Sequence, residues 1–269
     1  MLRDGGNAFD AAAAAVFVLN VTQPHLAGIG GSSNIVVHVA ADGRDSAIDA
    51  RERAPAATTP EMFQGLTAGA ASVEGFSVGV PGTLRAVETM LERWGTMSLK
   101  TTLGPAIDHA EHGITVRSFL AKDALQATRD PAVLDPRRNR AESFSPETKA
   151  LFYPNGTPVT EGATLYQPEL AKTFKLIADA GTSAPFYRGE IAQAIVEAQK
   201  WHTLAQGEGR MTLADLAAYD VDIRAASHLD YRGYDVYSAP PSSCGGLVLL
   251  EALGLLENDR FPLGDGGRG

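Results

Sequence analysis

Residues 34–55, NIVVHVAADGRDSAIDARERAP, predict the element on which the fold depends, a buried β-hairpin with a charged end. Residues 34–40 are rich in valine and isoleucine, residues 41–44 contain the Asp-Gly pair typical of hairpin turns, and residues 45–49 form the return strand. An aspartate, two arginines and a glutamate then precede a proline. We therefore ask which of these charges meets a ligand and which lies at the surface.

Helical patterns lie on both sides of this hairpin in the sequence. Ala11 to Val21 predict an almost wholly apolar helix, with Asn7 as its N-cap, Asp10 in its first turn and Pro24 after its end. Further helices are predicted over residues 81–94, 99–112, 172–180, 191–200, 211–219 and 247–256, and short strands over about 221–227 and 231–238. Thr212 is the predicted N-cap of the helix over 211–219. Since no internal linker is visible, we expect a single domain over residues 1–269 that alternates α and β.

The composition excludes several classes of protein. Of the 269 residues, 44% are hydrophobic and 20% are charged, as in ordinary globular proteins. The net charge of −9, without a cluster of Lys or Arg, argues against a nucleic-acid or anionic-membrane surface. No apolar stretch is long enough to span a bilayer. The N-terminal residues lack the layout of a signal peptide, so no export signal is visible in this chain.

The single cysteine, Cys244, excludes an internal disulfide and a cysteine zinc site. It precedes a predicted helix, whose N-terminus could stabilise a thiolate. No histidine lies close to it in sequence. We therefore expect Cys244 to be a small buried residue.

The stretch GFSVG at residues 75–79 matches the nucleophile elbow, with Ser77 as nucleophile and His202 or His228 downstream. An elbow needs a strong strand before the serine and a helix directly after it. Here the preceding residues form a poor strand, and Pro81 delays the helix. We favour an ordinary connection between a strand and a helix.

Two further motifs resemble cofactor or metal sites only in part. GIGGSS at residues 28–33 has Ser33 where a dinucleotide fingerprint requires glycine. The stretch DHAEH lacks the spacing of known zinc motifs, so we interpret its side chains as a solvated helical face (Asp108, His109, Glu111 and His112). The sequence predicts neither a cofactor nor a metal.

Arg51 and Arg53 share one face of the predicted strand end with Asp49, because side chains alternate with a period of two. An ion pair with Asp49 is one explanation for either arginine, and a ligand contact is the other. Spacing alone leaves both open.

Nine segments together resemble the gamma-glutamyltranspeptidases, in the order that they have along the large subunit of that family. The segments run from residue 4 to about residue 257: DGGNAFDAAAAA, TQPHLAGIGG, IDARERAP, SVGVPGTLRAVE, RWGTM, PAIDHAEHGI, FYRGEIA, TLADLAAY and YRGYDVYSAPPSSCGG. Cys244 interrupts the usual PPSSGG run, and both ends of the chain look truncated relative to the family.

The resemblance implies an N-terminal-nucleophile hydrolase, with a four-layer αββα sandwich of which this chain is the large-subunit portion. Such precursors cleave themselves, and the new N-terminal threonine of the small subunit is both nucleophile and, through its amine, base. No catalytic residue is then expected in this chain, which agrees with the lack of a catalytic triad. The implied partners are the small subunit and a γ-glutamyl substrate such as glutathione, with no cofactor. The implied location is periplasmic or secreted, with the cytoplasm as the alternative.

The family's D-x-R-E-x-A-P motif appears here as residues 49–55, and its arginine binds the α-carboxylate of the glutamyl group. The resemblance therefore gives that role to Arg51. Other relatives act on cephalosporin side chains, oxamate or poly-γ-glutamate, and a non-catalytic scaffold is a further alternative. We expect the isolated chain to be inert and to fold poorly without its partner.

Overall fold

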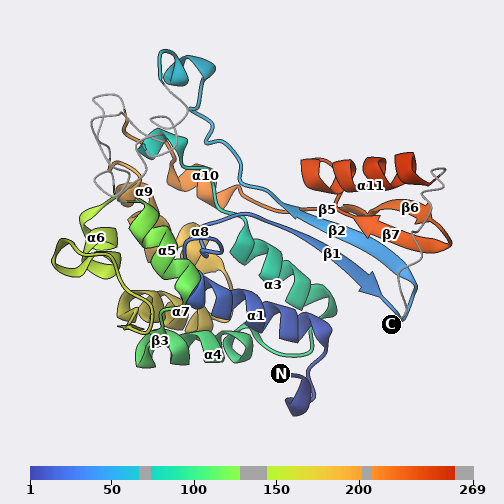
Figure 1. Cartoon of the computed structure of the whole chain (residues 1–269), viewed down its shortest axis with the longest axis horizontal. Helices are drawn as coiled ribbons and strands as arrows, with labels where there is room; N and C mark the ends of the chain where they lie inside the picture. Colours follow the sequence, from blue (N-terminus) through green and yellow to red (C-terminus); the bar gives the residue numbers. More distant parts are fainter. Residues whose placement is uncertain (67–73, 128–143, 202–206, 258–269) are drawn as a thin grey trace, which may run out of the picture. The chain divides into compact units, whose positions relative to one another are not determined.

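The computed structural model describes residues 1–66, 74–127, 144–201 and 207–257 (Figure 1). Contacts within the chain separate two compact units. The helical unit comprises Met1–Gly31 and Glu52–Asp220, and the sheet unit comprises Ser32–Arg51 and Val221–Gly269. The prediction of a single domain stays a prediction.

The helical unit begins with the apolar helix that the sequence predicts, α1 (Ala8–Thr22). The Asn7 side chain accepts hydrogen bonds from the amides of Phe9 and Asp10, at 2.9 and 3.1 Å, and the Asp10 carboxylate accepts the Asn7 amide at 2.7 Å. This reciprocal capping box confirms the predicted N-cap.

Asp10 also ties α1 to the loop that follows α3 (Thr83–Trp94). Its carboxylate accepts the amides of Thr96 and Met97, at 2.9 and 3.0 Å, and the Thr96 hydroxyl at 2.6 Å. Burial by itself would raise the pKa of Asp10, but the hydrogen bonds from Thr96, Asn7 and Met97 outweigh it and lower the pKa to about 2. The charged carboxylate is therefore part of the folded structure.

The core of the helical unit forms where α1 packs on α3 and α4 (Leu99–His112), and α4 packs on α7 (Pro168–Ala180) (Figure 1). Phe17 and Phe174 meet edge to face, with ring centroids 6.1 Å apart, and both are fully buried. Gly113 ends α4 with φ 87°, a conformation that glycine adopts without strain. The predicted helices 81–94, 99–112 and 172–180 are thus confirmed, the last one longer at its start.

The rest of the helical unit consists of short elements. Thr212 caps α10 (Leu213–Ala217) as predicted, and α9 (Glu190–Ala198) matches the helix predicted over 191–200. The remaining elements were not predicted from the sequence: α5 (Ser118–Ala127), α6 (Pro146–Phe152), α8 (Ala184–Arg188), the strand pair β3 (Ile114–Thr115) and β4 (Thr164–Leu165), and the 3-10 turns Leu2–Asp4, Pro60–Phe63, Gly75–Ser77 and Pro154–Gly156.

The sheet unit contains the predicted hairpin, β1 (Ser33–Val39) and β2 (Arg44–Ala50). The two strands are antiparallel, with Ile35 opposite Ile48 and Ser33 opposite Ala50. The edge of β2 that faces away from β1 pairs with β5 (Asp222–Ala225), again antiparallel, so the strand order is β1-β2-β5. β2 is therefore the central strand of this sheet.

A second hairpin, β6 (Ser227–Tyr231) and β7 (Tyr234–Ser238), corrects the prediction of two strands over residues 221–238. Three strands lie there, because Arg232 and Gly233 both have positive φ, 53° and 80°, and reverse the chain. An Arg-Gly pair lacks the Asn or Asp that usually identifies such a turn in a sequence. The helix α11 (Cys244–Leu256) packs on both strands and begins at Cys244 rather than at Leu247 (Figure 1).

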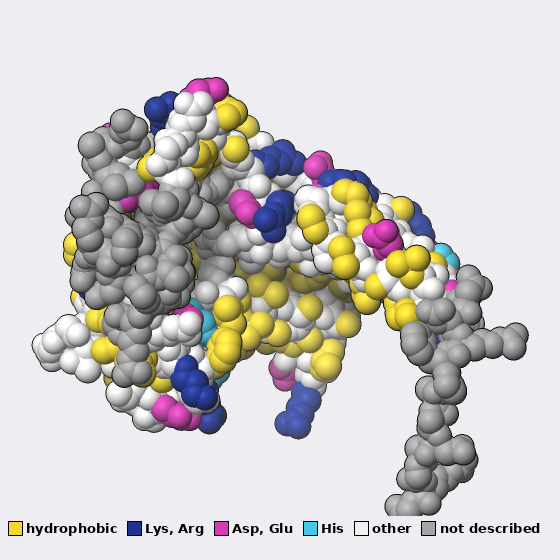
Figure 2. Space-filling model, turned by 45° about the horizontal axis from the view of Figure 1, so that its top comes forward, with side chains coloured by type: hydrophobic (Ala, Val, Ile, Leu, Met, Phe, Trp, Pro, Cys, Tyr) yellow, Lys and Arg dark blue, Asp and Glu magenta, His cyan; other side chains and the backbone are white. Residues whose placement is uncertain are grey.

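Apolar side chains of α11 lie at the surface of the sheet unit. Leu255 is 74% exposed and Val248 is 62% exposed, whereas Gly246 is the buried residue of this helix. Figure 2 shows hydrophobic side chains at the surface in yellow. Among the described residues, no helix is long and apolar enough to cross a membrane.

Candidate functional site

Arg51 follows the last residue of β2, in the sheet unit, and its side chain is exposed. Its backbone amide donates a hydrogen bond of 3.1 Å to Oδ1 of Asp49. An aspartate that accepts the amide two residues ahead forms a local turn of its own. The end of β2 that carries Arg51 is therefore shaped by the Asp49 side chain.

The Asp49 carboxylate accepts several hydrogen bonds, and its side chain is only 10% exposed. Nη2 of Arg224 lies 2.5 Å from Oδ2, and the Ser242 hydroxyl lies 3.1 Å from each carboxylate oxygen. Burial by itself raises the pKa of Asp49, but the Arg51 amide, the hydroxyl and amide of Ser242, and the charge of Arg224 lower it. Asp49 is thus held as a carboxylate.

Arg224 joins two stretches of chain that are far from Asp49 in sequence. It lies on β5, opposite Ala47 of β2, and Nη1 donates a hydrogen bond to the carbonyl of Pro241. Its guanidinium therefore spans Asp49 and the turn before α11. Asp49 forms an ion pair with Arg224, whereas the sequence had suggested Arg51 or Arg53 as its partner. Periodicity could not identify it, because Arg224 is 175 residues from Asp49.

Arg53, the other candidate of this stretch, belongs to the helical unit. Its backbone forms an antiparallel bridge with Val80, through hydrogen bonds of 3.3 and 2.7 Å. The centre of its guanidinium lies 5.4 Å from the centroid of the Tyr219 ring, within the range of a cation–π contact. Tyr219 stacks in turn on Tyr187. These contacts give Arg53 a packing role in its own unit.

The alternative nucleophile, Ser77, lies in a 3-10 turn over Gly75–Ser77, and the next helix begins only at Thr83. A nucleophile elbow requires a helix directly after the serine. Of its suggested bases, His228 lies 2.6 Å from Asp235 in the sheet unit, and His202 lies outside the described residues. This geometry favours the ordinary connection over the elbow.

The glycine-rich loop before β1 has a structural task in the helical unit. The carbonyl of Gly31 accepts the amides of Gly82 and Thr83, at 3.0 and 3.1 Å, where α3 begins. A Cβ on Gly31 would lie 3.1 Å from the carbonyl oxygen of Gly28, which is tighter than ordinary contacts. The loop thus anchors the start of α3.

The histidine and acidic side chains at the end of α4 are exposed, as predicted (Asp108, His109, Glu111 and His112). His112 lies 2.9 Å from Asp108, and Glu111 pairs with Lys175 of α7. In the described part of the chain, no group of three His, Cys, Asp or Glu residues could hold a metal ion.

The prediction that Cys244 is buried is wrong, because its side chain is exposed. The helix turns Gly246, not Cys244, toward the hairpin. A Cβ at Gly246 would lie 2.2 Å from the carbonyl oxygen of Ala239, so this close approach admits only glycine.

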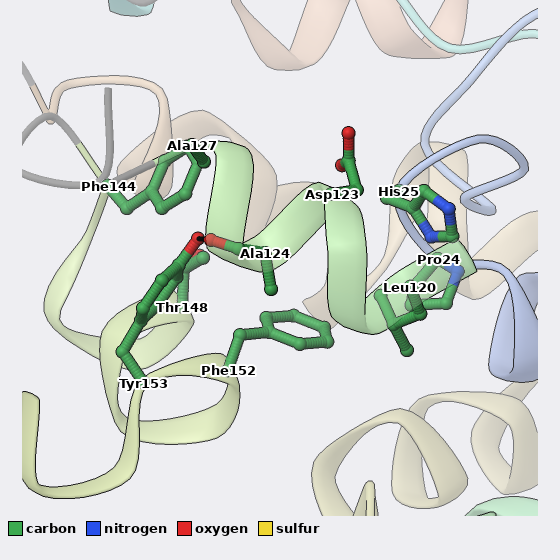
Figure 3. Close-up of a pocket in the computed structure, with 10 residues that line it drawn as sticks. All are labelled: Pro24, His25, Leu120, Asp123, Ala124, Ala127, Phe144, Thr148, Phe152 and Tyr153. Carbon is green, nitrogen blue, oxygen red and sulfur yellow. Dashed lines mark hydrogen bonds between the residues drawn. The ribbon is translucent and has the colours of Figure 1, made fainter. Parts of the chain in front are cut away.

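A cavity of about 320 Å³ lies in the helical unit, beside α5 and α6 (Figure 3). Its lining is mainly apolar and aromatic, with Asp123 among its polar residues. The Tyr153 hydroxyl donates a hydrogen bond of 3.0 Å to the carbonyl of Ala124. Both ring nitrogens of His25 are buried, and neither has a hydrogen-bond partner among the described residues. An imidazole in this state costs free energy in the folded protein.

Comparison with known proteins gives one consistent result. A family model described as gamma-glutamyltranspeptidase matches residues 1–266. A glutathione hydrolase proenzyme of Bacillus subtilis (strain 168) is 40% identical over 263 residues, which cover 96% of this chain and 42% of that protein. The acylase ACY 1 proenzyme of Pseudomonas sp. (strain SE83) is 34% identical over 273 residues, covering 96% and 45%.

The fold agrees with this result. The crystal structure of Helicobacter pylori gamma-glutamyltranspeptidase matches with a TM-score of 0.86 and 34% identity, over 99% of this chain and 73% of that chain. The predicted mixed α/β fold of an N-terminal-nucleophile hydrolase is thereby confirmed. This chain spans less than half the length of the B. subtilis and Pseudomonas proenzymes.

Proposed function

Because this chain belongs to the gamma-glutamyltranspeptidase family, we propose that it is the large-subunit part of a self-processing enzyme that hydrolyses or transfers γ-glutamyl amides such as glutathione. The observation that carries the proposal is the match of nearly the whole chain to a glutathione hydrolase proenzyme. The partner is the small subunit released from the same precursor. Export to the periplasm or the medium is part of the proposal, and a cytoplasmic location is its alternative.

In the proposed reaction, the nucleophile is the N-terminal threonine of the small subunit. Its hydroxyl attacks the amide carbonyl, and its own amine accepts the proton and returns it to the leaving amine. Water or an acceptor amine then releases the γ-glutamyl group from the threonine ester. This chain contributes the binding of the substrate, with no cofactor and no nucleophile of its own.

Arg51 is the residue of this chain that we propose to bind the α-carboxylate of the γ-glutamyl group. A planar guanidinium can hold a carboxylate through two parallel hydrogen bonds. Its position after the end of β2 supports the role, because Asp49 fixes the backbone there and its charge is taken up by Arg224 and Ser242.

The Pseudomonas acylase is a specific reason to keep a second candidate function, an amidohydrolase with another amide substrate. A non-catalytic scaffold is the third. A mass spectrum of the complete protein purified from cells separates the scaffold from both enzymes, because a companion polypeptide that begins with threonine is expected only for an enzyme.

Assays with a chromogenic γ-glutamyl anilide and with the matching 4-aminobutyryl anilide, which lacks the α-carboxylate, then separate the two enzymes. Strong preference for the γ-glutamyl anilide is expected. Equal turnover of the two compounds would contradict the proposed function and favour the other amidohydrolase.

A further inference from the structure

We infer that Arg224 and Ser242 are positioning residues for the substrate carboxylate, acting on Arg51 through Asp49. The inference rests on the proposed role of Arg51. It adds two residues that lie far from Arg51 in sequence and that spacing did not identify.

The first step is the turn that ends β2. Pairing of β1 with β2 ends at Ser33 opposite Ala50, and Arg51 comes directly after it. The hydrogen bond from the Arg51 amide to Oδ1 of Asp49 sets the direction in which the chain leaves the sheet. The position of the Arg51 guanidinium therefore depends on where the Asp49 carboxylate is held.

The second step is what holds that carboxylate. The Ser242 hydroxyl bonds both oxygens, and Nη2 of Arg224 bonds Oδ2, which leaves Oδ1 directed at the Arg51 amide. A largely buried carboxylate needs such partners to stay charged and in place. Without Arg224, the carboxylate would lose its ion pair and the fixed orientation of its two oxygens.

The guanidinium of Arg224 makes two hydrogen bonds to different parts of the sheet unit. One guanidinium nitrogen bonds Asp49 and the other bonds the Pro241 carbonyl, so a single side chain sets β5, β2 and the turn before α11 at fixed distances. The carboxylate of Asp222, 3.9 Å away, also faces this guanidinium. A lysine could make one of the two bonds but not the fork. Arg224→Lys should therefore be partly active.

The test uses the complete, self-processed enzyme carrying Arg224→Gln, Arg224→Lys or Ser242→Ala. Arg44→Gln is the matched control, because Arg44 lies at the opposite end of β2 and pairs with the exposed Asp42. We expect Arg224→Gln to lower kcat/KM for the γ-glutamyl anilide by roughly tenfold or more, mainly through KM. Residues that share one hydrogen-bond network are commonly coupled by an effect of this size. The control should be unchanged, and Arg224→Lys and Ser242→Ala should lose less.

A double-mutant cycle with Arg51→Lys distinguishes positioning from a general loss of structure. If Arg224 acts through Arg51, Arg224→Gln should have little further effect once Arg51 is a lysine. Turnover of the 4-aminobutyryl anilide, which has no α-carboxylate, should also change little. The fraction of cleaved precursor, read by mass spectrometry, corrects each rate for incomplete processing.

The outcomes separate this inference from the proposed function. A harmless Arg51→Lys would overturn the carboxylate anchor itself. A crippling Arg51→Lys together with an additive or absent effect of Arg224→Gln would overturn only the positioning role. If Arg224→Gln fails to fold, Ser242→Ala takes its place in the cycle, and an additive loss there is the contrary result.

Discussion

The two units differ in how completely they bury their apolar residues. In the helical unit, α1, α4 and α7 enclose a core in which Phe17, Phe174 and Leu103 are fully buried. In the sheet unit, the sequence of α11 is at least as apolar as those of α1, α4 and α7, yet Leu255 is 74% exposed and Val248 is 62% exposed. Apolar surface of this kind is typical of interaction sites. The helical unit therefore contains its own core, while the sheet unit, which carries Arg51, has an apolar face suited to a partner.

The largest effect is expected from a break in the closed core. Phe174→Ala should lower the free energy of unfolding of the complete protein by about 3–5 kcal/mol, because it leaves a cavity. Leu176→Ala is the matched control on the same helix, since Leu176 is 39% exposed. Denaturant unfolding measures both variants. Equal losses would mean that the helical unit is not closed as described.

The next effect separates two arginines that are close in sequence but belong to different units. In the complete, self-processed enzyme, Arg51→Lys should lower kcat/KM for the γ-glutamyl anilide without blocking self-cleavage. Loss of one partner of a charge pair that is buried once the substrate is bound costs roughly 2–5 kcal/mol, which corresponds to a roughly thirty- to several-thousandfold lower kcat/KM.

Arg53→Lys should do much less, because Arg53 contacts Val80 and Tyr219 in the helical unit. Steady-state kinetics of the two variants, side by side, give the answer. Similar, mild losses of kcat/KM in both variants would contradict the proposal that Arg51 binds the substrate carboxylate.

A smaller effect, on stability, is expected from the pH dependence of Asp10 in the helical unit. The pKa of Asp10 is about 2 in the folded state, below its ordinary value of 3.8, so the folded protein binds this proton more weakly than the unfolded chain. The resulting stabilisation is complete above about pH 4 and is lost as the pH falls toward 2, and it amounts to roughly 2 kcal/mol or less.

Asp10→Asn should flatten the pH dependence of the unfolding midpoint between pH 2 and 5. Asp4→Asn is the control, because it removes the same charge from an exposed carboxylate close by. A parallel change in both variants would show that net charge, and not the capping box, is responsible.

The smallest effect is a gain in stability. His25→Leu should raise the free energy of unfolding by up to about 1 kcal/mol, because it removes two buried ring nitrogens that have no hydrogen-bond partner in the described part of the chain. His109→Leu, at an exposed position of α4, should change little. Destabilisation by His25→Leu would instead indicate that a water or a ligand satisfies the imidazole in the cavity of Figure 3.

Local signals explain what the sequence could predict. The cap at Asn7, the Asp-Gly turn before β2 and the N-cap at Thr212 each act within a few residues, so they are visible in the sequence and confirmed. The β6–β7 hairpin was missed because its Arg-Gly turn lacks the usual signal, and Cys244 was misplaced because burial in α11 depends on tertiary packing.

The candidate site shows the same limit. Arg51 was identified from a family motif, whereas spacing alone did not distinguish Arg51 from Arg53 as a ligand-binding residue. Arg224 and Ser242 reach Asp49 from 175 and 193 residues away, and no pattern in the sequence connects them. Pairings of this range come from the strand order β1-β2-β5, which only the fold reveals.

That strand order also has a consequence for the timing of synthesis. β2 is complete at Ala50, but its second neighbour, β5, begins only at Asp222. At roughly 5–20 residues per second, the ribosome needs about 10–35 s to reach it. Throughout this interval the growing chain carries a finished hairpin in which the edge of β2 that later pairs with β5 is open, and open edges of this kind pair with other chains. Chaperone demand should therefore be greatest before residue 222 emerges, and slower translation of the helical unit should lengthen the exposure.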